Sequence, residues 1–287
     1  MKIPAGLQPL LDDGIIDEVV RQLKSGKEAA VYVVRSGSTI RCAKVYKDMA
    51  QRSFQQRAQY QEGRKVRGSR QTRAMEKSTR FGRKEQEAAW KNTEVDALYQ
   101  LVAAGVRVPQ PFGFFDGVLI MELVTDAEGQ SAPRLGEVDF SAEEARVVHG
   151  FLIRQVVRML CVGLIHGDLS EFNVLIGAQG PVIIDLPQAV NAAGNNNALA
   201  MLQRDVKNLA DTLGQFAPEL LATDYAREMW SLFEQGELKP ETLLTGAYVD
   251  DAAAPDLGDV IVAIDEARDE AIRRQRGREA ANAGADG

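Results

Sequence analysis

Cysteine and histidine are scarce in this chain, and long hydrophobic runs are missing. Two cysteines and two histidines among 287 residues are too few for the usual zinc site. Cys42 and Cys161 lie in apolar stretches, so we expect reduced core residues rather than disulfide partners. No run reaches the roughly 18–20 apolar residues that span a bilayer, and the N-terminus lacks a signal-peptide block. These absences predict a cytoplasmic protein with no membrane contact.

Hydrophobic residues make up 45% of the chain, which is enough for a core. The length suits one large domain or two lobes around a cleft. The net charge of −7 is unevenly distributed: residues 50–84 hold eleven basic and two acidic residues, a net +9, and the remainder carries −16. Because so many like charges cannot be buried, we expect a flexible insert over about 48–84.

This basic insert has two functional interpretations and one in which it has no function. It contains hydroxyl groups that could be autophosphorylated: Ser53, Ser69, Thr72, Ser78 and Thr79. It could also contact an acidic partner such as RNA or a ribosomal particle, although few aromatic residues are present for stacking. The bland interpretation is a solvated insertion without function.

The remaining pattern predicts an α+β chain. Strands are expected at residues 16–24, 29–37 and 39–47, and a hairpin turn at Asp116-Gly117. Helices are expected at residues 85–104, 142–161, 197–216, 218–235 and 259–276, the second behind the capping box of Ser141 and Glu144. A turn at 178–181 separates two short apolar runs. We therefore expect a β-rich N-terminal lobe with one main helix (1–121), a hinge (122–125), a helical C-terminal lobe (126–277) and a solvated tail (278–287).

The octet HGDLSEFN, residues 166–173, carries the strongest chemical signal. Asp168 and Asn173 are five positions apart between an apolar helix and an apolar strand, and Asp185 ends the next strand pattern. A loop and a neighbouring strand end can bring these side chains together. Phosphoryl transfer needs a carboxylate that orients the attacking hydroxyl and oxygen ligands that hold Mg²⁺ against the phosphates. The alternative is three polar residues that cap a buried hairpin, but the whole constellation favours catalysis.

The N-terminal half supplies a counterpart that could bind phosphates. Ser25-Gly26-Lys27 opens a loop between two strand patterns, where backbone N–H groups can meet phosphate oxygens. With a single glycine the signal is weak, and it is not a Walker A motif. Lys44 is a charge inside an apolar strand, which is either an edge residue or half of an ion pair that reaches the phosphates. Glu94, on the apolar face of the first predicted helix, is its natural partner.

The order of these segments resembles a protein-kinase-like fold, and their details resemble the RIO family of atypical serine/threonine protein kinases, closest to its RIO1-like bacterial branch. GKEAAVY (26–32) resembles the family's GKEA-x-VY loop, HGDLSEFN its H-x-DLSE-[FY]-N catalytic loop, and IIDLPQAV (183–190) its IID-x-x-Q-x-V metal loop. The resemblance covers about residues 15–235. It implies a two-lobed fold with an ATP cleft between the lobes.

The resemblance also implies an activity and its catalytic residues. The protein would transfer the γ-phosphate of ATP to serine or threonine hydroxyls of an unknown protein substrate and of itself, with Mg²⁺, or alternatively Mn²⁺, as the cation. Asp168 would be the catalytic base, and Asn173 and Asp185 the metal ligands. Asp185 is also the position of the phosphorylated aspartate associated with the family. Lys44 would hold the phosphates and pair with Glu94.

The nucleotide contacts follow from the same resemblance. Ser25, Gly26 and Lys27 would cover the phosphates. Met121 would lie at the back of the adenine pocket, and the backbones of Glu122 and Val124 would bind adenine. Asp205 would brace the catalytic loop from a helix.

Two departures from ordinary protein kinases leave the substrate open. Gly167 stands where they have an arginine, and Leu186-Pro187 replaces Phe-Gly after the metal aspartate; no Ala-Pro-Glu segment follows. One rival is a small-molecule kinase of the aminoglycoside or choline type, which shares the H-G-D-x-x-x-x-N loop. The other is an ATPase switch in ribonucleoprotein assembly, which would use the same residues.

Overall fold

The structure is a computed structural model that describes residues 3–26, 29–46 and 94–248. The chain divides into two compact units, Met1–Ala247 and Tyr248–Gly287, and every element below belongs to the first. The basic insert, the predicted helix at 259–276 and the predicted tail lie outside the described residues, as do Lys27 and the first part of the helix predicted at 85–104.

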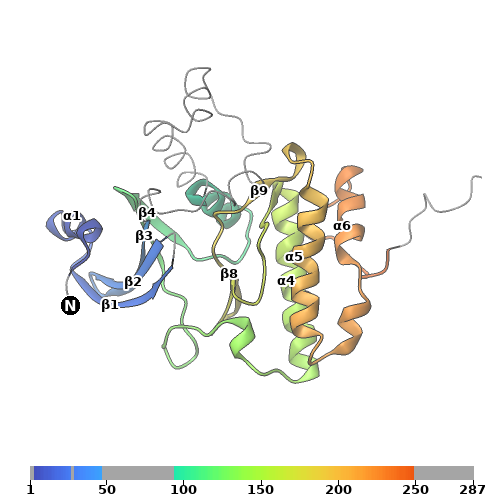
Figure 1. The fold of residues 1–287 in the computed structure, drawn as a ribbon, viewed down its shortest axis with the longest axis horizontal. Coiled ribbons are helices and arrows are strands. Elements are labelled where there is room, and N and C mark those ends of the chain that lie inside the picture. Colours follow the sequence, from blue (N-terminus) through green and yellow to red (C-terminus); the bar gives the residue numbers. More distant parts are fainter. Residues whose placement is uncertain (1–2, 27–28, 47–93, 249–287) are drawn as a thin grey trace, which may run out of the picture. The chain divides into compact units, whose positions relative to one another are not determined.

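Five antiparallel strands form the N-terminal sheet, in the order β1-β2-β3-β5-β4 (Figure 1). Their bounds are β1 Glu18–Ser25, β2 Ala29–Ser36, β3 Thr39–Tyr46, β4 Pro111–Phe115 and β5 Val118–Glu122. The hairpin predicted at Asp116-Gly117 is present. Gly37 (φ +61°) turns the chain between β2 and β3, and Asp116 and Gly117 (φ +46° and +82°) connect β4 to β5. Positive φ is the geometry that Asp-Gly hairpin turns require.

The two faces of this sheet have different neighbours. One face is covered by the short helix α1 (Gln8–Asp12) and the 3-10 turn η1 (Ala5–Leu7), from which Leu7 and Leu10 pack on Tyr32, Val34 and Ile120. The opposite face carries a row of side chains in register, Val33, Cys42 and Met121, with Lys44 two residues further along β3. Because side chains alternate along a strand, Lys44 and Met121 face the same side.

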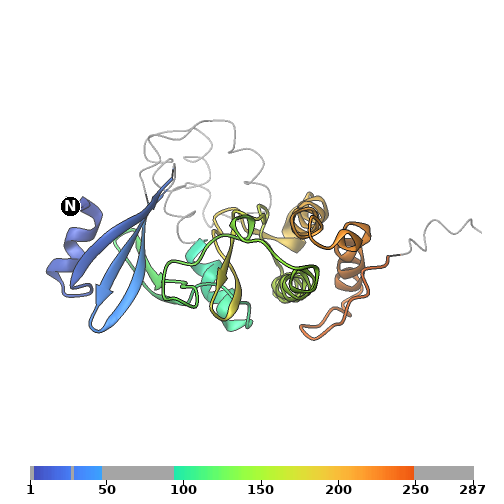
Figure 2. The same ribbon diagram turned by 90° about the horizontal axis from the view of Figure 1, so that it is seen from below.

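Three helices build the C-terminal half: α4 (Ala142–Cys161), α5 (Ala198–Leu213) and α6 (Tyr225–Glu234), which lie side by side (Figures 1 and 2). The predicted capping box is present, because Ser141 and Glu144 exchange hydrogen bonds of 2.8 and 3.2 Å. The single helix predicted at 218–235 is wrong. It is divided into the 3-10 turn η6 (Pro218–Ala222) and α6, because Thr223 is extended and the Asp224 side chain accepts from the Arg227 amide.

Two small antiparallel pairs frame the predicted catalytic and metal loops. β6 (Leu164–Ile165) pairs with β9 (Val190–Asn191), and β7 (Val174–Gly177) pairs with β8 (Gly180–Ile183). Residues 166–173 therefore run from β6 to β7, and residues 184–189 run from β8 to β9. The two loops start and end at paired strands, which brings them together. The 3-10 turns η4 (Leu135–Glu137) and η5 (Ala192–Gly194) complete the described elements.

Residues 94–103 are helical, and Gly105 (φ +72°) follows. This helix is attached to the C-terminal half: Gln100 donates to the Val162 carbonyl at 2.9 Å, and the α4 residue Arg158 donates to the Gly105 carbonyl at 2.9 Å. The buried Gln155 of α4 accepts from the Arg107 amide at 2.8 Å. Throughout the described part of the chain, no helix combines the length and the apolar character needed to cross a membrane.

Candidate active site

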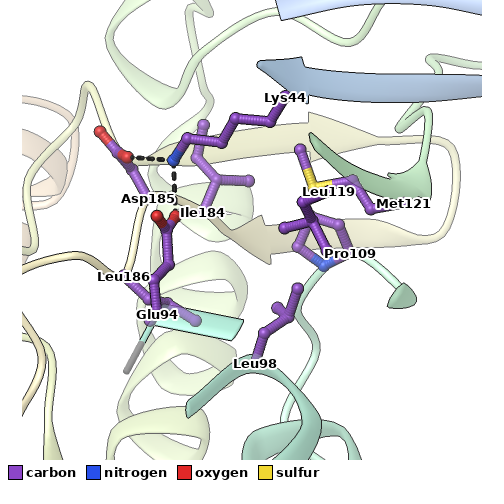
Figure 3. A pocket seen from close by; sticks show the side chains of 9 residues that line it. All are labelled: Lys44, Glu94, Leu98, Pro109, Leu119, Met121, Ile184, Asp185 and Leu186. Carbon is purple, nitrogen blue, oxygen red and sulfur yellow. Dashed lines mark hydrogen bonds and ion pairs between the residues drawn. The ribbon is translucent and has the colours of Figure 1, made fainter. Parts of the chain in front are cut away.

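Lys44 lies at the centre of the candidate site. Its Nζ is 2.5 Å from Glu94 Oε1 and 2.9 Å from Asp185 Oδ1 (Figure 3). Lys44 lies on β3, Glu94 at the start of helix 94–103 and Asp185 two residues after β8, so the contact joins three separate parts of the fold. Burial alone would lower the pKa of Lys44, but the two carboxylates outweigh it and raise that pKa above its usual value. The ammonium is therefore charged at neutral pH.

We predict that Lys44 and Glu94 are coupled in stability. Lys44→Met should lower the free energy of unfolding by ~3–5 kcal/mol, because it leaves Glu94 buried without its cation. Glu94→Leu should cost less, since Asp185 still pairs with Lys44. The double variant should cost much less than the two single effects added together. Urea denaturation of all four proteins measures this.

The exposed pair of Lys207 and Asp211 on α5 is the matched control. Breaking it should change the free energy of unfolding by no more than ~1 kcal/mol, because solvent screens both charges. Additive costs for Lys44→Met and Glu94→Leu would contradict the coupling that their contact implies.

The loop 166–173 is held from α5. The buried carboxylate of Asp205 accepts from the amides of Gly167 (2.7 Å) and Leu169 (2.9 Å), and Asn208 donates to the Leu169 carbonyl at 2.9 Å. Arg204 donates to the Gly167 carbonyl. The structure thus places Asp205 where the resemblance implied. Burial raises the pKa of Asp205, and the two backbone amides oppose this shift.

Gly167 is required by the geometry of this loop. Its φ is +80°, and a Cβ at this position would lie 2.6 Å from Met201 Cε and 2.8 Å from the Gln188 carbonyl oxygen. The larger side chain found here in ordinary protein kinases has no room. This close approach packs the loop 166–173 directly on residues 184–189.

Asp168 follows Gly167 and is exposed to solvent, although its carboxylate is partly desolvated. Burial is the main cause of its raised pKa, and Asp185 acts in the same direction, while His166 and Arg204 oppose it. The Asn173 amide donates to the Asp168 backbone carbonyl at 2.8 Å and reaches its carboxylate at 3.5 Å. The predicted base and the predicted metal ligand are therefore neighbours in space as well as in sequence.

Asn173 and Asp185 have the chemistry and the placement for a hard cation. The Asn173 carbonyl accepts from the Ile184 amide at 2.9 Å, which brings Asn173 beside the residue that precedes Asp185. Lys44 lowers the pKa of Asp185 although burial opposes it, so its carboxylate is ionised. One carboxylate and one amide oxygen suit Mg²⁺, which keeps several waters and takes phosphate oxygens as well. Among the described residues, no group of three or more His, Cys, Asp or Glu side chains is placed to hold a metal ion.

A mostly apolar pocket lies next to these charges. Figure 3 shows Met121, Leu119 and Pro109 on the side away from Asp185. Leu98, Ile184 and Leu186 complete the lining. Met121 is the next-to-last residue of β5. The chain that leaves β5 after it is where the resemblance puts the hinge.

The residues predicted to form the hinge make contacts that were not predicted from the sequence. Arg107 donates to both carboxylate oxygens of Glu122, at 2.6 and 2.8 Å, and thereby lowers the pKa of Glu122. The Glu122 amide donates to the Gln110 carbonyl at 2.8 Å, and the Val124 carbonyl accepts from Ala132 at 3.0 Å. The adenine contacts of these two residues stay a prediction.

The predicted phosphate loop is described only in part. Gly26 donates to the Ala29 carbonyl at 2.9 Å, which closes the loop between β1 and β2, and Ser25 ends β1. Lys27, the third residue of this prediction, lies outside the described residues. The structure brings together Lys44, Glu94, Asp185 and the Asp168–Asn173 loop.

Comparison with known proteins identifies the family that the sequence motifs resemble. The family model described as the RIO domain matches residues 30–226. The chain is 33% identical over 213 residues to the RIO-type serine/threonine-protein kinase Rio1 of Haloferax volcanii, which covers 72% of this chain and 67% of that protein. It is 30% identical over 204 residues to the human serine/threonine-protein kinase RIO1, which covers 70% of this chain and 34% of that protein.

A solved structure shares the fold. The Rio2 kinase of Chaetomium thermophilum, crystallised as an ADP/Mg²⁺-phosphoaspartate complex, matches with a TM-score of 0.56 at 21% identity, over 91% of this chain and 75% of that chain. The match to the archaeal and human relatives spans between about a third and two thirds of their length. From the domain match, the shared identity and the two-lobed kinase-like architecture, this chain belongs to the RIO family.

Proposed function

We propose that this protein is an ATP- and Mg²⁺-dependent serine/threonine kinase that transfers the γ-phosphate to a protein hydroxyl, including hydroxyls of its own chain. The observation that carries the proposal is the Lys44 contact with Glu94 and Asp185, beside the loop that holds Asp168 and Asn173. Its relatives are named serine/threonine-protein kinases, which supports the same reaction.

Each residue has a defined task in this proposal. Lys44 holds phosphate oxygens, and Glu94 keeps its side chain extended toward them. Asp168 orients the acceptor hydroxyl and takes its proton. Asn173 and Asp185 would hold Mg²⁺, which neutralises charge on the phosphates when bound. Because the reaction depends on positioning, the brace from Asp205 is part of the same machinery.

The nucleotide-binding residues and the second role of Asp185 belong to the same proposal. Met121 would line the back of the adenine site, with Glu122 and Val124 as hinge contacts and Ser25-Gly26-Lys27 over the phosphates. Asp185 would also be the aspartate that accepts a phosphoryl group. The ionised state of its carboxylate, which Lys44 favours, suits both tasks.

Three further expectations remain predictions. Residues 48–84 would carry autophosphorylation sites or contact an RNA-containing partner, and Mn²⁺ would substitute for Mg²⁺. The cytoplasmic location would follow from the composition.

The experiment that tests the proposal compares two products. Wild-type protein is incubated with γ-labelled ATP and Mg²⁺, and label on protein is measured beside released inorganic phosphate. A kinase should label itself or a mixed protein acceptor faster than it releases phosphate. Phosphate release without protein labelling would favour the ATPase switch, and labelling of an aminoglycoside or choline in place of protein would favour a small-molecule kinase.

A further inference from the structure

A second set of charged and aromatic side chains lies at the edge of the candidate site, outside the roles assigned above. The catalytic loop presents Phe172, whose side chain is 57% exposed although it is large and apolar. The guanidinium of Arg134 lies 5.9 Å from the centre of its ring. The exposed ring can pack on an apolar side chain of a ligand while the neighbouring cation meets an anion.

Arg134 is fixed in place by its backbone. The Arg134 amide donates to Glu137 Oε2 at 2.9 Å, and Arg134 forms an antiparallel bridge with Leu175 of β7. Gly136 lies so close to Glu171 that a Cβ there would be 2.9 Å from Glu171 Cγ. The segment 131–137 is therefore packed along the catalytic loop and the strand that follows it.

The first strand of the sheet brings another cation to this segment. Arg21 of β1 donates to Ser131 Oγ at 2.8 Å, which ties β1 to the segment. Lys24, which is exposed on the same strand, has a lowered pKa, chiefly because of partial desolvation and also because of the charge of Arg134. Of the two carboxylates that oppose this shift, Asp185 already pairs with Lys44 and Glu137 accepts from the Arg134 amide.

Within the described part of the chain, neither the Lys24 ammonium nor the Arg134 guanidinium makes a hydrogen bond or an ion pair. The charge of Arg134 acts unfavourably on Lys24, so an anion that contacts both side chains is stabilised. A carboxylate suits this position, because arginine binds both of its oxygens.

We propose that Lys24, Arg134 and Phe172 bind the acceptor of the reaction, and that the acceptor is an acidic peptide segment. This inference rests on the proposed kinase function. Phe172 is four residues from Asp168, which bounds their separation at about 14 Å. An acceptor whose hydroxyl reaches Asp168 therefore places Asp or Glu, within about four positions of the serine, against Arg134 and Lys24. An apolar side chain of the peptide packs on Phe172.

The test uses matched serine peptides that differ at one flanking position, which is Glu, Gln or Lys. Wild-type protein should show kcat/KM about tenfold higher for the best Glu peptide than for its Gln partner. Arg134→Glu should abolish this preference and favour the Lys peptide. Phe172→Ala should raise KM for all the peptides. The control is Arg154→Glu, the same charge change at an exposed arginine on α4, which should keep the wild-type ratio.

The outcomes separate this inference from the proposed function. Equal kcat/KM for the Glu and Gln peptides in the wild type, with both labelled, would overturn the acidic acceptor and leave the kinase activity intact. An Arg134→Glu effect that appears as a higher KM for ATP with an unchanged peptide ratio would assign the cations to the nucleotide instead, and would also overturn it. Phosphate release without labelling of any peptide or protein would overturn the proposed function, and this inference with it.

Discussion

Asp168→Asn should reduce transfer of labelled γ-phosphate to protein by about 10²–10⁴-fold. The amide keeps the size and the backbone contacts of Asp168, including the 2.8 Å bond from Asn173 to its carbonyl, but it cannot accept the hydroxyl proton. Binding of ATP should change little, because this carboxylate would face the acceptor. Initial rates of protein labelling, beside nucleotide affinity, give the measurement.

The pH dependence of the wild type gives a second view of the same group. Asp168 must be ionised to act as a base, and burial raises its pKa. Activity should therefore fall as the pH decreases, starting at a higher pH than for an ordinary aspartate. Two results would contradict the assignment. One is that Asp168→Asn labels protein at the wild-type rate, and the other is that wild-type activity falls only at the pH where a free aspartate is protonated.

Asp185→Asn should reduce activity by roughly 10²–10³-fold, through the cation and the phosphates rather than through folding. An amide is a weaker ligand for Mg²⁺ than a carboxylate and removes one charge next to Lys44. Folding should survive, because Asp185 has φ +68° and asparagine tolerates this conformation well. A titration of nucleotide binding with Mg²⁺ should show a weaker dependence on the cation.

Asp96→Asn is the matched control for this variant, since Asp96 is exposed on helix 94–103. It should keep wild-type activity and melting temperature. If Asp185→Asn melts far below the wild type without nucleotide, then Asp185 stabilises the fold through Lys44, and its role as a cation ligand is wrong.

Elements that depend on a few neighbouring residues could be predicted from the sequence. Asp116-Gly117 and the Ser141–Glu144 box define a turn and a helix start within four residues, so they can be read without knowledge of the fold. Helix α1 was not predicted, because five residues are too short for a periodic pattern. The split at Thr223–Asp224 was missed because apolar residues on both sides continue the same spacing.

The site shows the same division between local and distant information. The loop 166–173 is a contiguous motif, and its residues could be named from the sequence. Other contacts depend on how strands and helices pack. These are the pair of Arg107 with Glu122 and the contact between Lys44 and Asp185, two residues that are 141 positions apart. No local pattern records such contacts. The pairing of Glu94 with Lys44 was anticipated only because an apolar helix face left that carboxylate without another explanation.

The attachment of helix 94–103 to α4 has a mechanical consequence. Gln100, Arg158 and Gln155 connect this helix and its following loop to the C-terminal half, so Glu94 and Asp185 share one support. Lys44 belongs to the other support, the sheet. If the sheet rocks over the cleft as nucleotide enters and leaves, the spacing of the two carboxylates stays constant. The rotatable bonds of the lysine stem then take up the displacement, as a tether between two rigid bodies would.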